Sequence, residues 1–246
     1  MANNHYKDNK DQRLYHIEGL NKDLPSVTTI LGLLDKSGPL LGWGVKVTIE
    51  YLQQHPEELR ENPTETFKKA KLYYRELKEK ATELGSEVHN LLEVFLKGQN
   101  ITGLLVANPK LKPAFEAFLL WQKKYKFELV EAEHIIWSDL GYAGTLDCVA
   151  RLDGKLYVID FKSSKAIYDE YELQVAAYAA AYEERSEKEV EGIGILRLGK
   201  ENGLPEWREI PLVNRHDLMD MFMALCHYWH IRQRRKDGHQ DRKTDK

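Results

Sequence analysis

The stretch GTLDCVARLDGKLYVIDFKSS, residues 144–164, decides the fold. Two apolar runs, residues 144–152 and 155–162, each have the length and the β-branched content that are typical of a strand. Asp153 and Gly154 stand between these runs, and both residue types tolerate the positive φ that a two-residue hairpin turn requires. The stretch therefore predicts an antiparallel β-hairpin.

The second strand of this hairpin is apolar on both faces until its carboxyl end, where Asp160 and Lys162 follow. Residues two apart in a strand point to the same side and lie about 6–7 Å apart, so the two charged groups lie together. The hairpin also brings Asp147, on the preceding strand, near Asp160. Because such pairs at strand ends are often surface ion pairs of little energy, a structural role and a chemical role both remain open.

The chemical interpretation depends on the two carboxylates. At close range, Asp147 and Asp160 repel each other and their proton affinity rises. A bound Mg²⁺ or Mn²⁺ removes that conflict, since hard cations prefer oxygen ligands. Lys162 would then hold an attacking water or a phosphate against the metal. Hydrolysis of a phosphodiester needs these components, so the hairpin is a candidate nuclease site.

The chain before the hairpin is predicted to be mostly helical. Pro25 and Ser26 favour a helix start, and Gly38-Pro39 is expected to break the chain again. Further helices are expected over residues 45–55, over residues 61–98 with Pro63 near the start and Gly98 at the stop, and over residues 108–125.

The hydrophobic period changes after this helical half. Strands are predicted over residues 132–138, 191–199 and 206–212, and helices over residues 170–184 and 213–235. The first of these helices would cross over to a strand that lies parallel in the same sheet. The expected fold class is therefore α/β (α+β), with a central mixed β-sheet flanked by helices and a helical N-terminal half.

We expect one integrated domain with four parts. They are a flexible arm over residues 1–13, a helical part over residues 14–130, a core over residues 131–232 and a flexible basic tail over residues 233–246.

Composition excludes several classes of protein. The 246 residues carry a formal net charge of −3, so any contact with a polyanion must use local patches. Cys148 and Cys226 are too few for a disulfide framework or for the four ligands of an iron–sulfur cluster. Residues 1–13 have neither a secretory nor a transit character, and no apolar run could span a membrane. We therefore expect a cytoplasmic protein.

Three motifs then carry a resemblance to a known family: GYAGTLD (residues 141–147), VIDFKSS (158–164) and LQVAAY (173–178). They place G-x-x-D on one strand, D-x-K on the next and Q-x-x-x-Y on the following helix. This order resembles the PD-(D/E)xK nuclease superfamily in its RecB-like exonuclease branch, and is similar to mitochondrial genome maintenance exonucleases and their phage and bacterial relatives. The resemblance covers residues 24–215 and is dense over residues 141–182.

The resemblance implies a restriction-endonuclease-like core and a role for individual residues. It assigns catalysis to Asp147, Asp160, Lys162 and Gln174, and metal binding to His89, Asp147, Asp160 and the backbone carbonyl of Phe161. Tyr178 would pack beside Gln174, one helical turn away. Glu133 is a weaker candidate for an outer contact to the metal or for a second metal, and Ser163 either bonds a phosphate or ends the strand.

The residues alone leave simpler alternatives open for three of these positions. His89, between Val88 and the apolar residues that follow, also fits an ordinary histidine on a helix. Gln174 also fits a surface amide, and Tyr178 also fits a core side chain.

Basic and aromatic residues alternate over residues 68–80, and Lys68, Lys69, Tyr73, Tyr74 and Arg75 are the candidates for nucleic-acid binding. Lysine and arginine would contact phosphates, and the tyrosines would stack on the bases of a single strand. The same pattern also fits a solvated helix with Glu–Lys pairs at i,i+4. The basic tail could add non-specific affinity for DNA.

The expected function is that of a metal-dependent DNA exonuclease. It would use one or two Mg²⁺ or Mn²⁺ ions, act at single-stranded ends in DNA repair, recombination or replication, and work in a bacterial, archaeal or phage-infected cell. Three alternatives remain: a duplex-processing 5′–3′ exonuclease of the phage recombination type, a restriction-type endonuclease, and a non-catalytic DNA-binding module with the same fold.

Overall fold

The computed structural model describes residues 5–9, 12–20 and 23–244. The chain divides into two compact units: Met1–Leu33 together with Val88–Lys246, here the sheet unit, and Leu34–Glu87, here the helical unit. These boundaries differ from the single integrated domain expected above. Helix α4 (Pro63–Leu96) crosses the boundary, so its last turns belong to the sheet unit and its first turns do not.

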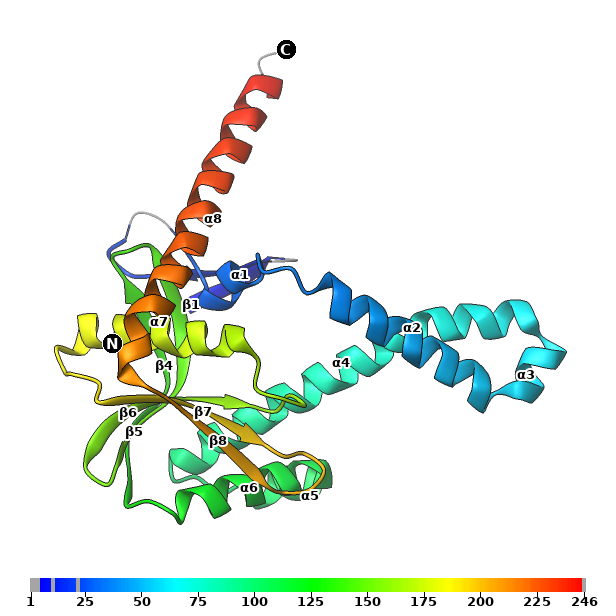
Figure 1. Ribbon diagram of the computed structural model, residues 1–246, viewed down its shortest axis with the longest axis horizontal. Helices are drawn as coiled ribbons and strands as arrows, with labels where there is room; N and C mark the ends of the chain where they lie inside the picture. The colour runs from blue at the N-terminus through cyan, green and yellow to red at the C-terminus, as the bar shows by residue number, and fades with distance from the viewer. Residues whose placement is uncertain (1–4, 10–11, 21–22, 245–246) are drawn as a thin grey trace. The chain divides into compact units, whose positions relative to one another are not determined.

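The sheet unit is built on five strands in the order β4-β5-β6-β7-β8 (Figure 1). Their bounds are β4 Phe127–Ser138, β5 Tyr142–Leu152, β6 Lys155–Lys162, β7 Gly192–Leu198 and β8 Pro205–Ile210. β6 pairs with β7 in parallel, whereas the other neighbouring pairs are antiparallel. The predicted mixed sheet is confirmed, including the parallel strand that follows the crossover helix α7 (Asp169–Ser186).

The hairpin of β5 and β6 turns at the predicted position. Asp153 and Gly154 have φ values of 51° and 89°, the positive values that a tight hairpin turn requires. The Asp153 carboxylate also accepts a hydrogen bond of 2.8 Å from the backbone N–H of Lys126. This turn sets the register in which β5 and β6 meet.

Helices cover both faces of the sheet. Figure 1 shows α7 on one face and α6 (Lys112–Gln122) on the other. On the α6 side, the buried rings of Phe118 and Phe161 meet at a centroid distance of 5.7 Å. α7 and α6 therefore cover the two faces of β6, as the apolar sequence of this strand requires.

The N-terminal segment differs from the flexible arm expected over residues 1–13. In its described part, β1 (His5–Asn9) pairs antiparallel with β2 (Gln12–His16), which pairs with β3 (Leu24–Pro25). The segment is anchored because Tyr15 is 1% exposed and packs against Tyr6 at 5.5 Å. Residues 1–4 and 10–11 lie outside the described residues.

Helix α1 (Val27–Leu31) begins as predicted. Ser26 is its N-cap, and its hydroxyl accepts a hydrogen bond of 2.8 Å from the backbone N–H of Thr29. Such a cap satisfies one of the free donors of the first turn.

The helical unit consists of α2 (Ser37–Gln54), α3 (Pro56–Glu61) and the first turns of α4. The expected break at Gly38-Pro39 is wrong, because both residues lie in the first turn of α2. Proline is tolerated there, since the N–H groups of a first turn have no partner within the helix. The stop at Gly98 is confirmed: α4 ends at Leu96 and Gly98 has a φ of 71°.

Two helical connections complete the sheet unit. α5 (Thr102–Ala107) and the short 3-10 helix η1 (Pro109–Leu111) lead into α6, and a second 3-10 helix, η2 (Leu212–Asn214), leads into α8 (Arg215–Thr244). α8 continues through most of the tail that was expected to be flexible from residue 233, since arginine, lysine and glutamine favour helix. Within the described ranges, no helix combines the length and the apolar character that crossing a membrane would need.

Candidate metal-binding active site

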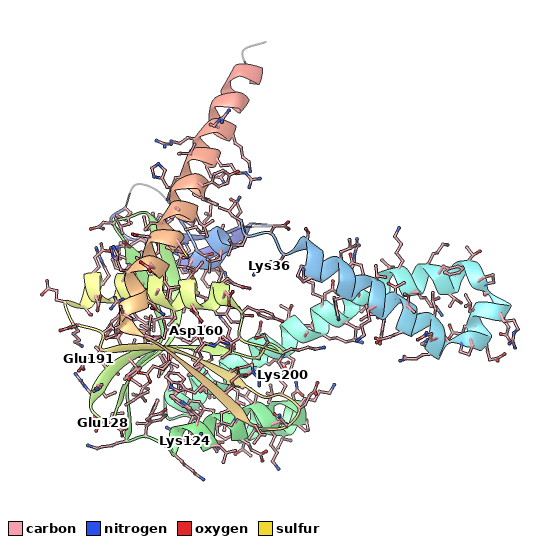
Figure 2. The ribbon with its side chains drawn as sticks, in the orientation of Figure 1. Lys36, Lys124, Glu128, Asp160, Glu191 and Lys200 are labelled. Carbon is pink, nitrogen blue, oxygen red and sulfur yellow. The ribbon has the colours of Figure 1, made fainter. Side chains whose placement is uncertain are left out.

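Three carboxylates lie in one row across β4, β5 and β6. Cys148 of β5 pairs with Ile159 of β6 in an antiparallel register. The next pair of residues in that register is Asp147 and Asp160, so these two carboxylates stand opposite each other. In the same way, the register of β4 and β5 places Glu133 opposite Asp147. Asp160 is 1% exposed and Asp147 is 9% exposed. Figure 2 shows Asp160 at the sheet, close under α7.

The backbone at Glu133 is unusual, since it has a φ of 49° inside a strand. Residues other than glycine rarely adopt a positive φ, and such conformations concentrate at functional sites. A register shift between Leu129 and Glu131 precedes this position. The irregular strand therefore carries the third carboxylate of the row.

His89 joins the row from α4. Its Nδ1 lies 3.2 Å from Asp147 Oδ1. One ligand atom from each of His89, Glu133 and Asp147 lies within 4.8 Å of the others. The flanking Val88 and Leu92 are each 1% exposed, so the packing of this part of α4 holds the imidazole in place.

Asp147 is bound at both of its oxygens, because the backbone N–H of Phe161 donates to Oδ2 at 2.6 Å. Asp160 is different. Lys162 Nζ lies 2.7 Å from its Oδ2, whereas its buried Oδ1 has no hydrogen-bond partner within the described part of the chain. Buried carboxylate oxygens normally have partners, so Oδ1 of Asp160 is an oxygen that a bound cation would satisfy.

A second chain of contacts positions Lys162. Its ammonium donates to Gln174 Oε1 at 2.9 Å, and Gln174 Nε2 donates to the hydroxyl of Tyr178 at 3.0 Å. Gln174 is 7% exposed and Tyr178 is 4% exposed. The structure therefore links Gln174 of Q-x-x-x-Y directly to the lysine of D-x-K, and Tyr178 to that lysine through Gln174. Gln174 is a buried amide rather than a surface one.

Gly144 allows this arrangement. A Cβ at Gly144 would lie 2.5 Å from Cε1 of Tyr178, closer than any carbon contact permits. The glycine of G-x-x-D is therefore required by the ring of Tyr178, whose hydroxyl accepts a hydrogen bond from the amide of Gln174. This contact links the first motif to the third.

Burial and mutual charge shift the pKa values of the acidic groups. Burial, helped by the charge of Asp147, raises the pKa of Glu133 to about 7. Burial raises the pKa of Asp160 to about 6, because it and the charge of Asp147 outweigh the attraction of Lys162. Burial also acts to raise the pKa of Asp147, but the charge and hydrogen bond of His89 hold it below the usual value.

The two basic groups are shifted toward their charged forms. Burial opposes the charge on His89, but Asp147 raises the pKa of the imidazole to about 9. Burial likewise opposes the charge on Lys162, and Asp160 and Asp147 raise its pKa in spite of it. The site therefore concentrates negative charge, which the cationic groups of His89 and Lys162 partly offset.

The other predicted residues are Ser163 and five residues of the helical unit. Ser163 is partly exposed directly after β6. The candidates for nucleic-acid binding lie in the helical unit, where Lys68 and Lys69 are paired with Glu65 and Glu58 at 3.6 and 3.1 Å. There, Tyr73 packs on Tyr51 at 5.0 Å, Tyr74 packs on Trp43 at 6.5 Å, and Arg75 Nε donates to the Tyr74 hydroxyl at 3.1 Å.

Sequence reasoning missed Tyr171. Its ring centroid lies 4.6 Å from Lys162 Nζ, the distance of a cation–π contact. The sequence did indicate that Tyr171 could lie near the site. It stands three residues before Gln174 on the same helix, and residues three apart share a helix face.

The chain is similar to proteins of known family and of known structure. The family model of the "PD-(D/E)XK nuclease superfamily" matches residues 70–235. No curated protein matches the chain. Among solved structures, a candidate exonuclease from Eubacterium rectale is 14% identical, with a TM-score of 0.39, over 57% of this chain and 64% of that one. A structure described as SSO0001 is 18% identical, with a TM-score of 0.27, over 59% of this chain and 74% of that one.

Proposed function

The chain belongs to the PD-(D/E)XK nuclease superfamily, and from this premise we propose that it is a DNA exonuclease that depends on Mg²⁺ or Mn²⁺. It would hydrolyse phosphodiester bonds at single-stranded ends, leave a 5′-phosphate and serve DNA repair, recombination or replication in the cytoplasm. Nucleases of this superfamily use divalent metal ions, and the row of carboxylates described above is a candidate site for such an ion.

The observation that carries this proposal is Asp160. Asp160 is 1% exposed; Lys162 contacts its Oδ2 at 2.7 Å, and its Oδ1 has no hydrogen-bond partner within the described residues. Such a buried oxygen is costly unless a second cation reaches it. Asp147 stands opposite it and adds negative charge. An all-oxygen set with one imidazole suits a hard divalent cation, so the residues fit the ion that the family implies.

We assign the metal to His89, Asp147, Asp160 and the carbonyl of Phe161, with Glu133 as an outer contact or as a ligand of a second ion. The ligand atoms of His89, Glu133 and Asp147 are already gathered within 4.8 Å. When bound, the ion would lower the pKa of a water and offset the charge of the phosphate.

Lys162 would orient the attacking water or the scissile phosphate. Its ammonium is held between Asp160 Oδ2 at 2.7 Å and Gln174 Oε1 at 2.9 Å. Both contacts favour the charged form, and a fixed cation stabilises negative charge as it develops on the phosphate oxygens. Gln174 and Tyr178 would act by positioning Lys162, and Ser163 would offer a hydroxyl to the phosphate.

We further propose that Lys68, Lys69, Tyr73, Tyr74 and Arg75 contact the nucleic acid. Alternating basic and aromatic residues on one helix support this role. The lysines would exchange their exposed glutamate partners for phosphates, at little cost since exposed ion pairs contribute little energy.

The test is cleavage of a labelled oligonucleotide by Asp160→Asn and Lys162→Ala, with Mg²⁺ and with Mn²⁺. Each variant should lose at least about 100-fold in rate, the size expected when one group that stabilises the transition state is removed. Glu128→Gln and Lys124→Ala change exposed residues of the same unit and are the matched controls. Full cleavage by both site variants would overturn the proposal.

A further inference from the structure

An aromatic pair at the start of α7 lies beside the lysine of the site. The ring centroid of Tyr171 is 4.6 Å from Lys162 Nζ. The ring centroid of Tyr168 is 5.5 Å from that of Tyr171, and the two planes meet at 77°. Lys162 Nζ is itself 2.7 Å from Asp160 Oδ2. Tyr168 is therefore connected to the carboxylates through Tyr171 and Lys162.

The outer member of this pair is open to solvent. Tyr168 is 46% exposed, whereas Tyr171 is partly buried against Lys162. Tyr6 and Tyr228 are also exposed, at 45% and 57%. Tyr6 packs on Tyr15 and Tyr228 lies on α8, so Tyr168 is the exposed tyrosine of the described residues that is joined to the site.

The backbone holds Tyr168 in a defined place. Tyr168 is the N-cap residue of α7, and its carbonyl accepts a hydrogen bond of 3.0 Å from the N–H of Tyr171. The preceding Ile167 is 7% exposed and anchors the loop. Arg208 of β8 donates to Glu172 at 3.2 Å and fixes the same turn. A ligand would therefore meet a preformed ring and lose little free energy to ordering it.

We propose that Tyr168, supported by Tyr171, is a stacking subsite for one unpaired nucleobase next to the phosphodiester that is cut. This inference rests on the proposed function. A phosphate held at Lys162 brings its own bases to the neighbourhood of that lysine, where the open aromatic ring lies. Every base has an apolar π-face, so stacking on tyrosine tolerates any sequence.

The subsite selects for single strands on physical grounds. Within a duplex, both faces of an internal base are covered by its neighbours in the stack, and the base of a terminal pair must first lose its pairing to reach the ring. An unpaired terminal base exposes a face at little cost, and the ring of Tyr168 can cover it. The arrangement thus gives this chain a preference for unpaired ends that does not depend on the helical unit.

The experiment compares wild type, Tyr168→Ala, Tyr168→Phe and the control Tyr228→Ala. The substrates are single-stranded oligonucleotides with a normal or an abasic nucleotide on either side of the scissile phosphate, and kcat/KM is measured for each. Tyr168→Ala should lower kcat/KM on the normal strand by roughly 5- to 100-fold, the range for loss of one stacked base. Tyr168→Phe and Tyr228→Ala should stay within about twofold of wild type, since phenylalanine keeps the stacking face.

The abasic substrates separate stacking from a structural effect. When the stacked base is absent, wild type and Tyr168→Ala should cut at equal rates; an equal loss on normal and abasic strands would overturn the subsite. A binding measurement in EDTA, with 2-aminopurine as the terminal base, should show quenching by wild type and by Tyr168→Phe but not by Tyr168→Ala. If wild type cuts no DNA with Mg²⁺ or Mn²⁺, the proposed function fails, and the quenching result still decides the subsite.

Discussion

Gly144 and Tyr178 approach each other so closely that a single added carbon on the glycine would lie 2.5 Å from the tyrosine ring. The tyrosine hydroxyl accepts from Gln174, and Gln174 accepts from Lys162. A packing contact between strand β5 and helix α7 thus determines where the lysine of the site is held. It also explains in physical terms why a glycine, an amide and a tyrosine accompany D-x-K in this chain.

Gly144→Ala should therefore impair the site without touching a charged group. The methyl group must displace Tyr178, at a cost of about 1–3 kcal/mol in the free energy of unfolding. Cleavage should fall at least about tenfold. Denaturant unfolding and rate measurements on the same samples test both effects.

Gly103→Ala is the matched control, because nothing lies within 4 Å of the added carbon. Its helical position predicts unchanged or slightly higher stability. A Gly144→Ala variant with the stability and rate of wild type would refute the proposed dependence on Tyr178.

Gln174→Ala tests the positioning of Lys162 more directly. Loss of the amide frees the ammonium and leaves the Tyr178 hydroxyl without its donor. We expect kcat to fall by about 10- to 100-fold, an effect of misplacement rather than of lost chemistry. KM and metal affinity should change little, since Gln174 is not among the proposed ligands; a selective rise in KM would point to a DNA contact instead.

Divalent ions should stabilise the folded protein. When the ion binds the row of carboxylates in the folded state only, the free energy of unfolding rises with the logarithm of the ratio of free ion concentration to Kd. The unfolding midpoint rises with it. Asp147→Asn and His89→Gln should weaken Mn²⁺ binding by at least about tenfold. Calorimetric titration and thermal unfolding with and without Mn²⁺ measure this. Equal Mn²⁺ affinity of both variants and wild type would remove these residues from the ligand set.

Glu133→Gln should raise stability at pH 8 when metal is removed by EDTA. Because burial and Asp147 raise the pKa of Glu133 to about 7, its ionised form disfavours the folded state. In the unfolded chain, the pKa of the Glu133 carboxyl is its ordinary value of 4.5, and below that pH the penalty is absent. The penalty on folding free energy grows as the pH rises and reaches its full size above pH 7. The glutamine variant avoids it and should gain about 1–3 kcal/mol at pH 8.

The same variant should show no gain at pH 4.5, where wild-type Glu133 is protonated in the folded state. Denaturant titrations at the two pH values make the comparison, and a gain of equal size at both would show that the effect is unrelated to ionisation. With Mn²⁺ present, the advantage at pH 8 should shrink, because the ion offsets the carboxylate charge.

Lys68→Gln together with Lys69→Gln should weaken binding of a single strand in a way that depends on salt. If both lysines contact phosphates, the slope of log Kd against log salt should fall by about 1.4 units. Lys110→Gln together with Lys124→Gln changes the same number of exposed lysines outside the helical unit and controls for net charge. Equal slopes for the two double variants would favour the reading of residues 68–80 as an ordinary solvated helix.

Local rules of the sequence failed at particular places for identifiable reasons. Gly38-Pro39 looked like a break but lies in the first turn of α2, where proline costs no hydrogen bond. Residues 1–13 looked disordered because they are polar, yet Tyr15 anchors their described part through long-range packing and a 2.9 Å hydrogen bond to Thr145. Such tertiary anchors leave little trace in a local pattern.

By itself, the sequence determined the β5–β6 hairpin, because turn chemistry at Asp153-Gly154 and a strand period act over a few residues. From that hairpin the approach of Asp147 to Asp160 followed, and the order of the motifs indicated the family. Only the tertiary structure decided that His89, 58 residues before Asp147, meets its carboxylate, and that Glu133 joins them through a strand of irregular register. The same holds for the contacts of Tyr178 with Gly144 and of Tyr171 with Lys162. The physical reason is that these contacts depend on how whole elements pack, whereas hydrophobic period and turn propensity report only on the residues next to one another in the chain.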